Sequence, residues 1–186
     1  MSLKETYQKE VVPKLREQFG YTNVHAVPTL KKISLNIGVG KGLTDNRFLE
    51  TAEQTLIRIT GQRPQRTKAR KSIAAFKIRQ GNIVGLKVTL RGKRMWDFLN
   101  KMLTYSLPRK RDFRGISAAH GFDAQGNYSL GFKEHIAFPE IHSDEIEVIH
   151  GLQVTCDTSA SSKEEAFALL QQLGFPFKEE KLPSKK

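Results

Sequence analysis

The sequence has little of the chemistry on which disulfide, zinc and membrane architectures depend. Its only cysteine, Cys156, can form neither an internal disulfide nor a cysteine-based zinc site. No uninterrupted apolar run approaches the roughly 18 residues that a membrane helix needs. The first five residues, MSLKE, do not form an apolar signal region. These absences predict a cytosolic protein with no membrane partner.

Motifs for catalysis and cofactor binding are missing or incomplete. The five histidines lack the HxH and HxxxH spacings of metal ligands, and there is no GxSxG motif. The segment 38–42, GVGKG, looks like a phosphate loop, but it lacks the Lys-Ser/Thr end of a Walker loop, and Leu43 replaces the last glycine of GxGxxG. We therefore expect no catalytic residue, no metal and no cofactor. Segment 38–42 is interpreted as a turn, with nucleotide hydrolysis or close approach to an RNA phosphate as alternatives.

The composition nevertheless supports a folded domain with a polyanionic partner. Hydrophobic residues make up 38% of the 186 residues and aromatics 9%, enough to bury a core, which argues against a disordered basic tail. The length suits one ordinary domain or two very small ones. The formal net charge is +12. A charge of this size indicates nucleic acid as the default partner, with an anionic membrane surface as the alternative.

The positive charge is concentrated in the middle third of the chain. Residues 58–114 contain 17 Lys and Arg but only two acids, a net charge of +15, while the other 129 residues carry −3. A concentrated patch is typical of phosphate binding, whereas a merely soluble surface would spread its charge. Three clusters, interleaved with Gln, Ser, Thr, Phe and Trp, make up the segment: Arg63, Arg66, Lys68, Arg70 and Lys71; Lys87, Arg91, Lys93 and Arg94; Arg109, Lys110, Arg111 and Arg114.

Hydrophobic periodicity predicts interspersed helices and strands. Helices are expected near 2–19, with a kink or restart at Pro13, and near 44–60, 95–103 and 162–173. Strands are expected near 33–39, 65–68, 84–90, 128–132 and 152–156. Capping boxes at Ser2 and Ser162, a cap at Thr44 and stops at Gly20, Gly61 and Gly174 mark the helix ends.

The two clearest strands each have one polar side. We therefore predict an α+β, two-layer fold: a mainly antiparallel sheet of about five strands, covered on one face by helices and open to RNA on the other. Asn36, Lys87, Thr89 and Arg91 would lie together on the uncovered side, a plausible platform for RNA. We expect a single domain over 1–177 and a polar C-terminal tail over 178–186.

The segment 71–81, KSIAAFKIRQG, is apolar enough for a core but is bracketed by basic residues. It is too short and broken for a regular helix or strand. Two interpretations stay open: a protruding loop that presents Phe76 and Ile78 to a partner, and a loop packed on its own domain.

Several segments, in order along the chain, resemble one known family. They are KKISLNIGVG at 31–40, TGQRP at 60–64, the segment 71–81, KVTLRG at 87–92, RDFRG at 111–115, GNYSLG at 126–131, FPEI at 138–141 and GFPF at 174–177. Each motif alone is weak, but the ordered set is specific. Together they are similar to the bacterial type of the large-subunit ribosomal protein L five family, over about residues 3–177.

The resemblance implies a structural protein of the large ribosomal subunit, located in the cytoplasm, that binds 5S rRNA in the central protuberance. It also implies contacts with large-subunit rRNA, P-site tRNA, other central-protuberance proteins and a small-subunit head protein. Asn36, Gln62 and Thr89 match the polar positions that meet RNA in the family. The family loop near the P site matches 72–81, so Ser72, Phe76, Lys77 and Arg79 are candidates for touching tRNA.

The same resemblance places the region of Arg109, Lys110, Arg111 and Arg114 at an intersubunit bridge. To the polar trio we add phosphate contacts from the basic segment: Arg63, Arg66, Lys68, Arg70, Lys87, Arg91 and Arg94. The prediction is thus a non-catalytic rRNA-binding protein. A free RNA chaperone or translational regulator with the same patch is the alternative.

Overall fold

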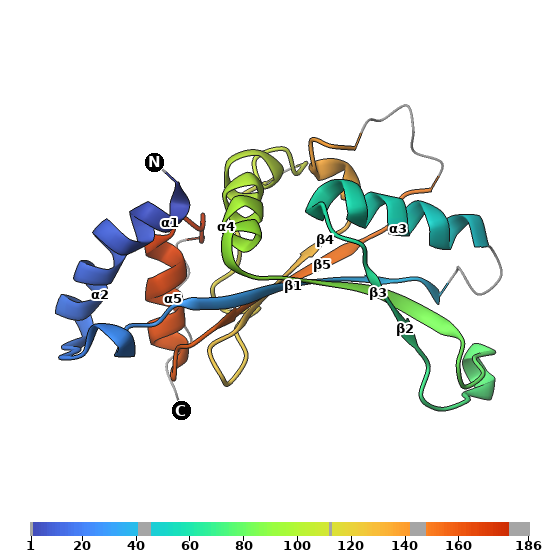
Figure 1. The fold of residues 1–186 in the computed structure, drawn as a ribbon, viewed down its shortest axis with the longest axis horizontal. Helices are drawn as coiled ribbons and strands as arrows, with labels where there is room; N and C mark the ends of the chain where they lie inside the picture. The colour runs from blue at the N-terminus through green and yellow to red at the C-terminus, as the bar shows by residue number, and fades with distance from the viewer. Residues whose placement is uncertain (1, 41–45, 112, 142–147, 179–186) are drawn as a thin grey trace. The chain divides into compact units, whose positions relative to one another are not determined.

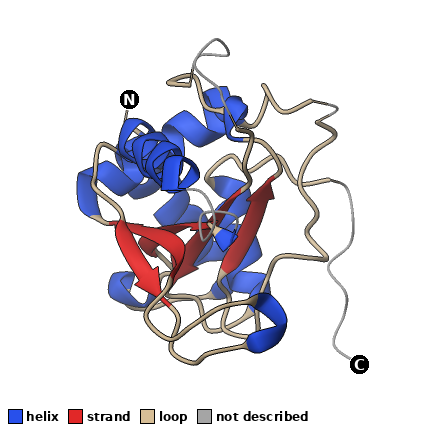
Figure 2. Cartoon of the chain, turned by 90° about the vertical axis from the view of Figure 1, so that its right-hand side faces the viewer, coloured by secondary structure: helices blue, strands red, loops and turns tan. Residues whose placement is uncertain are grey.

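The computed structural model describes residues 2–40, 46–111, 113–141 and 148–178, and within them the α+β prediction is confirmed. Five strands form one open antiparallel sheet in the order β2-β3-β1-β5-β4 (Figure 1). The strands are β1 (Leu30–Gly38), β2 (Gln65–Lys68), β3 (Ile83–Leu90), β4 (Tyr128–Phe132) and β5 (Leu152–Thr158). All five predicted strands are therefore present, and Figure 2 distinguishes strands from helices by colour in a second view.

The predicted helices are also present. The longer ones are α2 (Val12–Phe19), α3 (Asn46–Thr60), α4 (Gly92–Lys101) and α5 (Lys163–Gln172). Short helical segments are α1 (Leu3–Thr6), η1 (Tyr7–Val11), η2 (Val24–Ala26), η4 (Ala74–Phe76), η5 (Met102–Ser106) and η6 (His135–Ala137). The predicted cap Thr44 and the tail beyond Lys178 lie outside the described residues.

The N-terminal helix shows how a proline is accommodated. Ser2 makes the predicted capping box with Glu5. Pro13 has no amide hydrogen for a normal helical bond, and the turn before it widens into the π-helical segment η1, where Val12 N–H donates to the Tyr7 carbonyl. The helix then restarts as α2 and ends at Gly20, whose φ of 69° is left-handed. The restart predicted at Pro13 is confirmed.

The chain divides into two compact units. Unit 1 contains residues 1–33, 91–130 and 155–186, and unit 2 contains residues 34–90 and 131–154. Strands β1, β4 and β5 each contribute residues to both units. The prediction of a single domain over 1–177 stays a prediction.

The core of unit 2 lies between α3 and the strands. Alternate residues of β1 and β3 are buried, among them Leu35, Ile37, Leu86 and Val88. They lie against the apolar stripe of α3, which includes Leu56. Because side chains alternate along a strand, the intervening residues lie on the face without the helix.

The core of unit 1 is rich in aromatic side chains. Tyr128 is buried, and its ring packs against Phe122 at 4.6 Å and Phe177 at 5.6 Å between ring centres. Elsewhere in the unit, the rings of Tyr7 and Trp96 pack at 5.4 Å and join the N-terminal helix to α4. Aromatic pairs of this kind add to the free energy gained from burial.

Candidate nucleic-acid interface

The strand face of unit 2 that α3 does not cover carries a row of polar and basic side chains. In the antiparallel register, Gln65 pairs with Lys87 and Thr67 with Gly85, so these residues share a face. Thr89 lies two residues beyond Lys87 on β3 and therefore points the same way. We call Asn36, Gln65, Thr67, Lys87 and Thr89 the strand-face row.

Gly85 is closely packed in the middle of this row. A Cβ atom added to Gly85 would lie 2.8 Å from the hydroxyl oxygen of Thr67, 3.2 Å from the carbonyl oxygen of Ile37 and 3.9 Å from the amide oxygen of Asn36. The missing side chain thus leaves room for Thr67 and Asn36, from the two neighbouring strands, to lie close together over β3.

A β-bulge ends the row on β2. The register shifts between Thr67 and Lys68, so that Lys68 pairs with Ile83 and not with Val84. The extra residue of the bulge belongs to β3, where the regular alternation is interrupted, whereas β2 continues regularly. Lys68 therefore follows Thr67 on the other side of β2, and it is exposed.

The strand-face row carries no negative charge, and its side chains have no hydrogen-bond or ion-pair partner in the described part of the chain. The parts of β1, β2 and β3 in unit 2 contain no Asp or Glu. Within the described part of the chain, none of the side chains in the row makes a hydrogen bond or ion pair. Polar groups that lack partners in the protein remain available to hydrogen-bond an external ligand.

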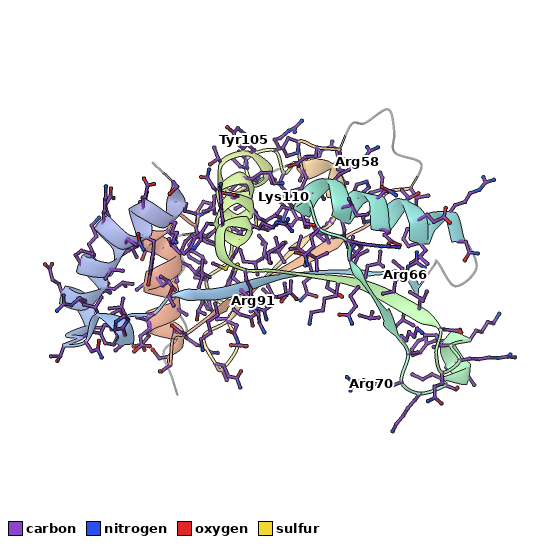
Figure 3. The ribbon with its side chains drawn as sticks, viewed as in Figure 1. Arg58, Arg66, Arg70, Arg91, Tyr105 and Lys110 are labelled. Atoms are coloured by element: carbon purple, nitrogen blue, oxygen red, sulfur yellow. The ribbon has the colours of Figure 1, made fainter. Side chains whose placement is uncertain are left out.

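Arg63 and Arg66 lie elsewhere, on the α3 side. Both bind the buried carboxylate of Glu53 on α3: Arg66 Nε and Nη2 donate over 3.0 and 2.6 Å, and Arg63 Nε donates over 3.3 Å. The hydrogen bonds from Arg66, more than those from Arg63, hold the pKa of the Glu53 carboxyl below its usual range. Figure 3 shows Arg66 near α3 and Arg70 beyond the far end of β2.

The other predicted rRNA-binding residues are dispersed. Gln62 lies in the turn after α3, where its backbone N–H donates to the Thr60 hydroxyl, and no described contact joins it to Asn36 or Thr89. Arg70 is exposed at the start of the loop after β2. Arg91, which precedes α4, and Arg94, in its first turn, are exposed in unit 1. The structure therefore brings together Asn36, Lys87 and Thr89 of the ten predicted residues, while Lys68 lies past the bulge at the end of β2.

The loop predicted to touch tRNA is a small ordered turn. Ile73 and Ile78 exchange two backbone hydrogen bonds of 2.9 and 3.1 Å, and the Ser72 hydroxyl accepts from Gln80 N–H. Lys77 closes the turn with a left-handed φ of 54°. Phe76 at its tip is 69% exposed. Of the two interpretations left open, the structure supports a protruding loop, with Ser72, Phe76, Lys77 and Arg79 all exposed.

The predicted bridge residues follow η5 in unit 1. Arg109, Arg111 and Arg114 are exposed and Lys110 is half-buried. Two successive turns hold them: Lys110 N–H donates to the Leu107 carbonyl, and Phe113 N–H to the Lys110 carbonyl. Tyr105 in the preceding helical segment is also exposed, and it extends this basic surface with an aromatic ring (Figure 3).

Unit 2 also buries a pair of histidines. The rings of His135 and His150 stack at 4.0 Å with 6° between their planes, and the Phe48 ring meets His150 edge-on. Burial lowers both pKa values, and that of His150 falls to about 4. The stacked geometry does not chelate a metal. Within the described residues no cluster of His, Cys, Asp or Glu could hold one.

Sequence reasoning missed four participants. Gln65 and Thr67 belong to the strand-face row, Gly85 lies between Thr67 and Asn36, and alternation along β2 and β3 was the signal that could have found them. Glu53 was not recognised, because nothing in the sequence marks an acid on the buried side of an amphipathic helix as the partner of two distant arginines.

The chain is similar to known ribosomal proteins over almost its whole length. Residues 23–79 match the family model described as ribosomal protein L5, and residues 83–177 match the model for the C-terminus of the same ribosomal family. A relative from Microcystis aeruginosa (strain NIES-843), named large ribosomal subunit protein uL5, is 51% identical over 176 residues. The alignment covers 95% of this chain and 98% of the relative. No helix in the described part of the chain has the length and apolarity to cross a membrane.

Proposed function

The chain belongs to the ribosomal protein L5 family, so it is a structural, non-enzymatic constituent of the large ribosomal subunit in the bacterial cytoplasm, and from this premise we propose that the strand-face row binds 5S rRNA in the central protuberance. Family membership excludes the nucleotide-hydrolase interpretation of segment 38–42. The observation that carries the proposal is the row itself: five polar or basic side chains on three strands, with no acid among them.

The chemistry of the row suits folded RNA. Lys87 supplies charge for phosphates, while Asn36, Gln65, Thr67 and Thr89 offer hydrogen bonds to 2′-hydroxyls and base edges. Gly85 lets Thr67 and Asn36 lie close together over β3. Phosphate contacts then give affinity, and the amide and hydroxyl contacts fix the register.

Two measurements test this proposal. Affinity for 5S rRNA should fall with salt, with a log–log slope of roughly −0.7 to −0.9 per phosphate neutralised. Asn36→Ala and Thr89→Ala should each weaken binding by about 1–3 kcal/mol, as specific polar contacts do. Ser129→Ala, a polar position on a strand face of unit 1, is the matched control. Wild-type affinity in both row variants would refute the proposed site.

We further propose that loop 72–81 contacts P-site tRNA. Phe76 is exposed at a tip held by backbone hydrogen bonds, and Lys77 and Arg79 flank it with positive charge. An exposed aromatic ring between cations suits stacking on a base together with phosphate contacts. Phe76→Ala should weaken tRNA binding to ribosomes by about 1–3 kcal/mol without changing 5S rRNA affinity. Unchanged tRNA binding would contradict the contact.

The bridge to the small-subunit head is proposed for Arg109, Lys110, Arg111 and Arg114. Their four cations in consecutive turns provide a concentrated charge for an acidic or phosphate-bearing partner. Replacing Arg109 and Arg111 with Gln should weaken subunit association, measured by sedimentation at limiting Mg²⁺, while 5S rRNA binding remains. Equal association of variant and wild-type large subunits would count against the bridge.

A further inference from the structure

Two sequence motifs that lie far apart in the chain meet in unit 1. The motif RDFRG at 111–115 leads into Ile116, and the motif GFPF at 174–177 follows α5. A parallel β-bridge joins them through two backbone hydrogen bonds of 2.9 Å: Ile116 N–H donates to the Pro176 carbonyl, and Lys178 N–H donates to the Ile116 carbonyl. The end of the described chain is thus paired with the residue that directly follows the cations proposed for the bridge between subunits.

Gly115 allows this pairing at close range. Its φ of 89° lies in the left-handed region that favours glycine. A Cβ atom added to it would lie 3.0 Å from the Pro176 carbonyl oxygen and 3.2 Å from the backbone nitrogen of Lys178. Any other residue at this position would strain the backbone and also push the C-terminal segment, residues 175–178, away from Ile116.

The ring of Phe177 fixes the C-terminal segment to the core of unit 1. It packs at 4.9 Å on Phe167 of α5 and at 5.6 Å on the buried Tyr128 of β4, measured between ring centres. The Tyr128 hydroxyl donates over 3.0 Å to the Ser117 carbonyl. Ile116 and Ser117, the two residues after Gly115, are therefore both tied to one aromatic cluster.

The cations proposed for the bridge have few other backbone restraints. We call these four residues the basic turn: Arg109, Lys110, Arg111 and Arg114. Its first part is held by Lys110 N–H, which donates to the Leu107 carbonyl, and by Phe113 N–H, which donates to the Lys110 carbonyl. Between Phe113 and Ile116, no backbone N–H donates to a carbonyl within the described part of the chain. Pairing with the C-terminal segment is therefore the next fixed point after Phe113, and it sets the direction of the chain at Arg114.

We propose that the C-terminal segment positions the basic turn for the contact with the small-subunit head, with Gly115 and Phe177 as positioning residues. The inference rests on the proposed bridge. Long cationic side chains lose conformational freedom when they bind a partner, and a backbone that is fixed on both sides of the turn reduces what must still be ordered. Neither Gly115 nor Phe177 needs to contact the partner, because both act through the basic turn.

The test uses variants of the full chain that differ in whether they disturb this pairing. Gly115→Ala adds a Cβ atom against the C-terminal segment. Gly20→Ala is its matched control, because it adds a Cβ at a left-handed φ of 69° with nothing within 4 Å. Both variants strain the backbone, but only the first displaces the segment. Phe177→Ala removes the ring, and Phe177→Leu is the conservative variant that keeps a large apolar side chain.

Hydrogen exchange at the Ile116 amide measures the pairing directly. It should be about tenfold faster in Gly115→Ala and Phe177→Ala, because the local opening that exposes this amide becomes easier. Gly20→Ala and Phe177→Leu should stay close to the wild-type rate. Large subunits that contain each variant are then titrated with small subunits at limiting Mg²⁺. Association should weaken about fivefold in Gly115→Ala and Phe177→Ala, the cost of ordering one long side chain, while 5S rRNA affinity is unchanged.

A double-mutant cycle separates positioning from a general loss of stability. Gly115→Ala is combined with Arg111→Gln and Arg114→Gln, which remove two cations of the basic turn. If Gly115 acts through these cations, the loss of association in the combined variant should be smaller than the product of the separate fold-changes. A variant that merely destabilises unit 1 would instead multiply the loss.

Two results would overturn the inference: equal association of Gly115→Ala and Gly20→Ala subunits, and independent effects in the cycle. Failure of the proposed bridge would appear differently, as wild-type association of subunits with Arg111→Gln and Arg114→Gln. Exchange at Ile116 would then decide alone. A wild-type rate in Gly115→Ala would refute the positioning role, and a faster rate would support it.

Discussion

The two units treat the polar sides of their strands in opposite ways. In unit 1 these groups pair with one another: Lys32 lies 3.8 Å from Asp157, and the hydroxyls of Ser129 and Thr155 are 3.1 Å apart. In unit 2 the strand-face row has no acid and no internal hydrogen bond among the described residues. A polar face that satisfies itself needs no partner, whereas one left unsatisfied is arranged for a partner of opposite charge.

The interiors of the two units also differ, in how many ionisable side chains they bury. The core of unit 1 contains the aromatic cluster of Tyr128, Phe122, Phe175 and Phe177. The ionisable side chains found buried in the described structure, other than Cys156 and Tyr128, are Glu53, His135 and His150, all in unit 2. Unit 2 therefore contains charges or potential charges that its own packing must accommodate, and changes in pH should affect it first.

The largest expected effect that tests the difference between the two units is the loss of stability in acid through the pair His135 and His150. The folded pKa of His150 is about 4, below its ordinary value of 6.5. The unfolded chain therefore binds the proton first, so stability is complete above pH 6.5 and falls as the pH drops towards 4. His150 alone should cost up to about 3 kcal/mol across this window.

Urea unfolding at pH 7.5, 5.5 and 4.5 measures that loss. His150→Gln should be less stable at pH 7.5 but should show a flatter dependence between pH 6.5 and 4. His120→Gln, an exposed histidine of unit 1, should keep the wild-type profile. If the unfolding free energies of wild type and His150→Gln changed equally with pH, burial of this ring would not make unit 2 more sensitive to acid.

A smaller effect is expected from adding a side chain at Gly85. In Gly85→Ala the new Cβ would meet the Thr67 hydroxyl at 2.8 Å and the Ile37 carbonyl at 3.2 Å. Overpacking of this kind costs about 1–3 kcal/mol, and displacement of Thr67 should also weaken 5S rRNA binding. Gly131→Ala is the control, because nothing lies within 4 Å of its added Cβ. Equal urea midpoints and RNA affinities for the two variants would show that close packing at Gly85 does not shape the strand-face row.

Neutralising the buried acid should have the next largest effect. Glu53→Gln keeps the shape but removes the charge that holds Arg63 and Arg66, whose side chains are 80% and 44% exposed. Because water can solvate the two guanidinium groups when their ion pairs with Glu53 are lost, we expect a decrease in unfolding free energy of only about 1–2 kcal/mol at pH 7. Since the folded pKa of Glu53 is lowered, the difference from wild type should vanish as the pH falls through that pKa. Glu50→Gln, exposed on the same helix, should change nothing measurable.

The smallest effect sharpens the comparison of the two strand faces. Lys32→Gln removes a long, partly exposed ion pair and should cost less than about 1 kcal/mol of stability. Lys87→Gln should leave stability unchanged but reduce the magnitude of the 5S rRNA salt slope by roughly 0.7–0.9, one phosphate contact. The two variants remove the same charge. If both change the salt slope equally, the distinction between the faces is wrong.

Local pattern predicted most of the fold. The alternation of Ile33, Leu35 and Ile37 and of Leu86, Val88 and Leu90 placed β1 and β3, and the capping box at Ser2 placed the first helix. These signals are local, since each depends on neighbours within one turn or strand. The strand order and the division into two units depend on contacts between distant residues, which one sequence does not encode in any local pattern.

The site was predicted in part for the same reason. Asn36, Lys87 and Thr89 could be assigned to one face by alternation alone, and the structure places them there. Arg66 could not, because its side is set by the register of β2 on β3. The bulge opposite Thr67 and Lys68 could not be predicted either, because it becomes visible only when both strands are paired. A positive charge in sequence thus indicated RNA binding but not the surface that each arginine or lysine serves.

The position of β2 at the edge of the sheet has a consequence for the chain before it joins a ribosome. An unprotected edge strand can pair with the same strand of another molecule and begin aggregation. Here the edge is four residues long, QRTK, carries two cations and is interrupted by a bulge. Two copies approaching edge to edge would repel each other. The β2 cations predicted from the sequence to bind rRNA would thus also keep newly made chains apart before assembly.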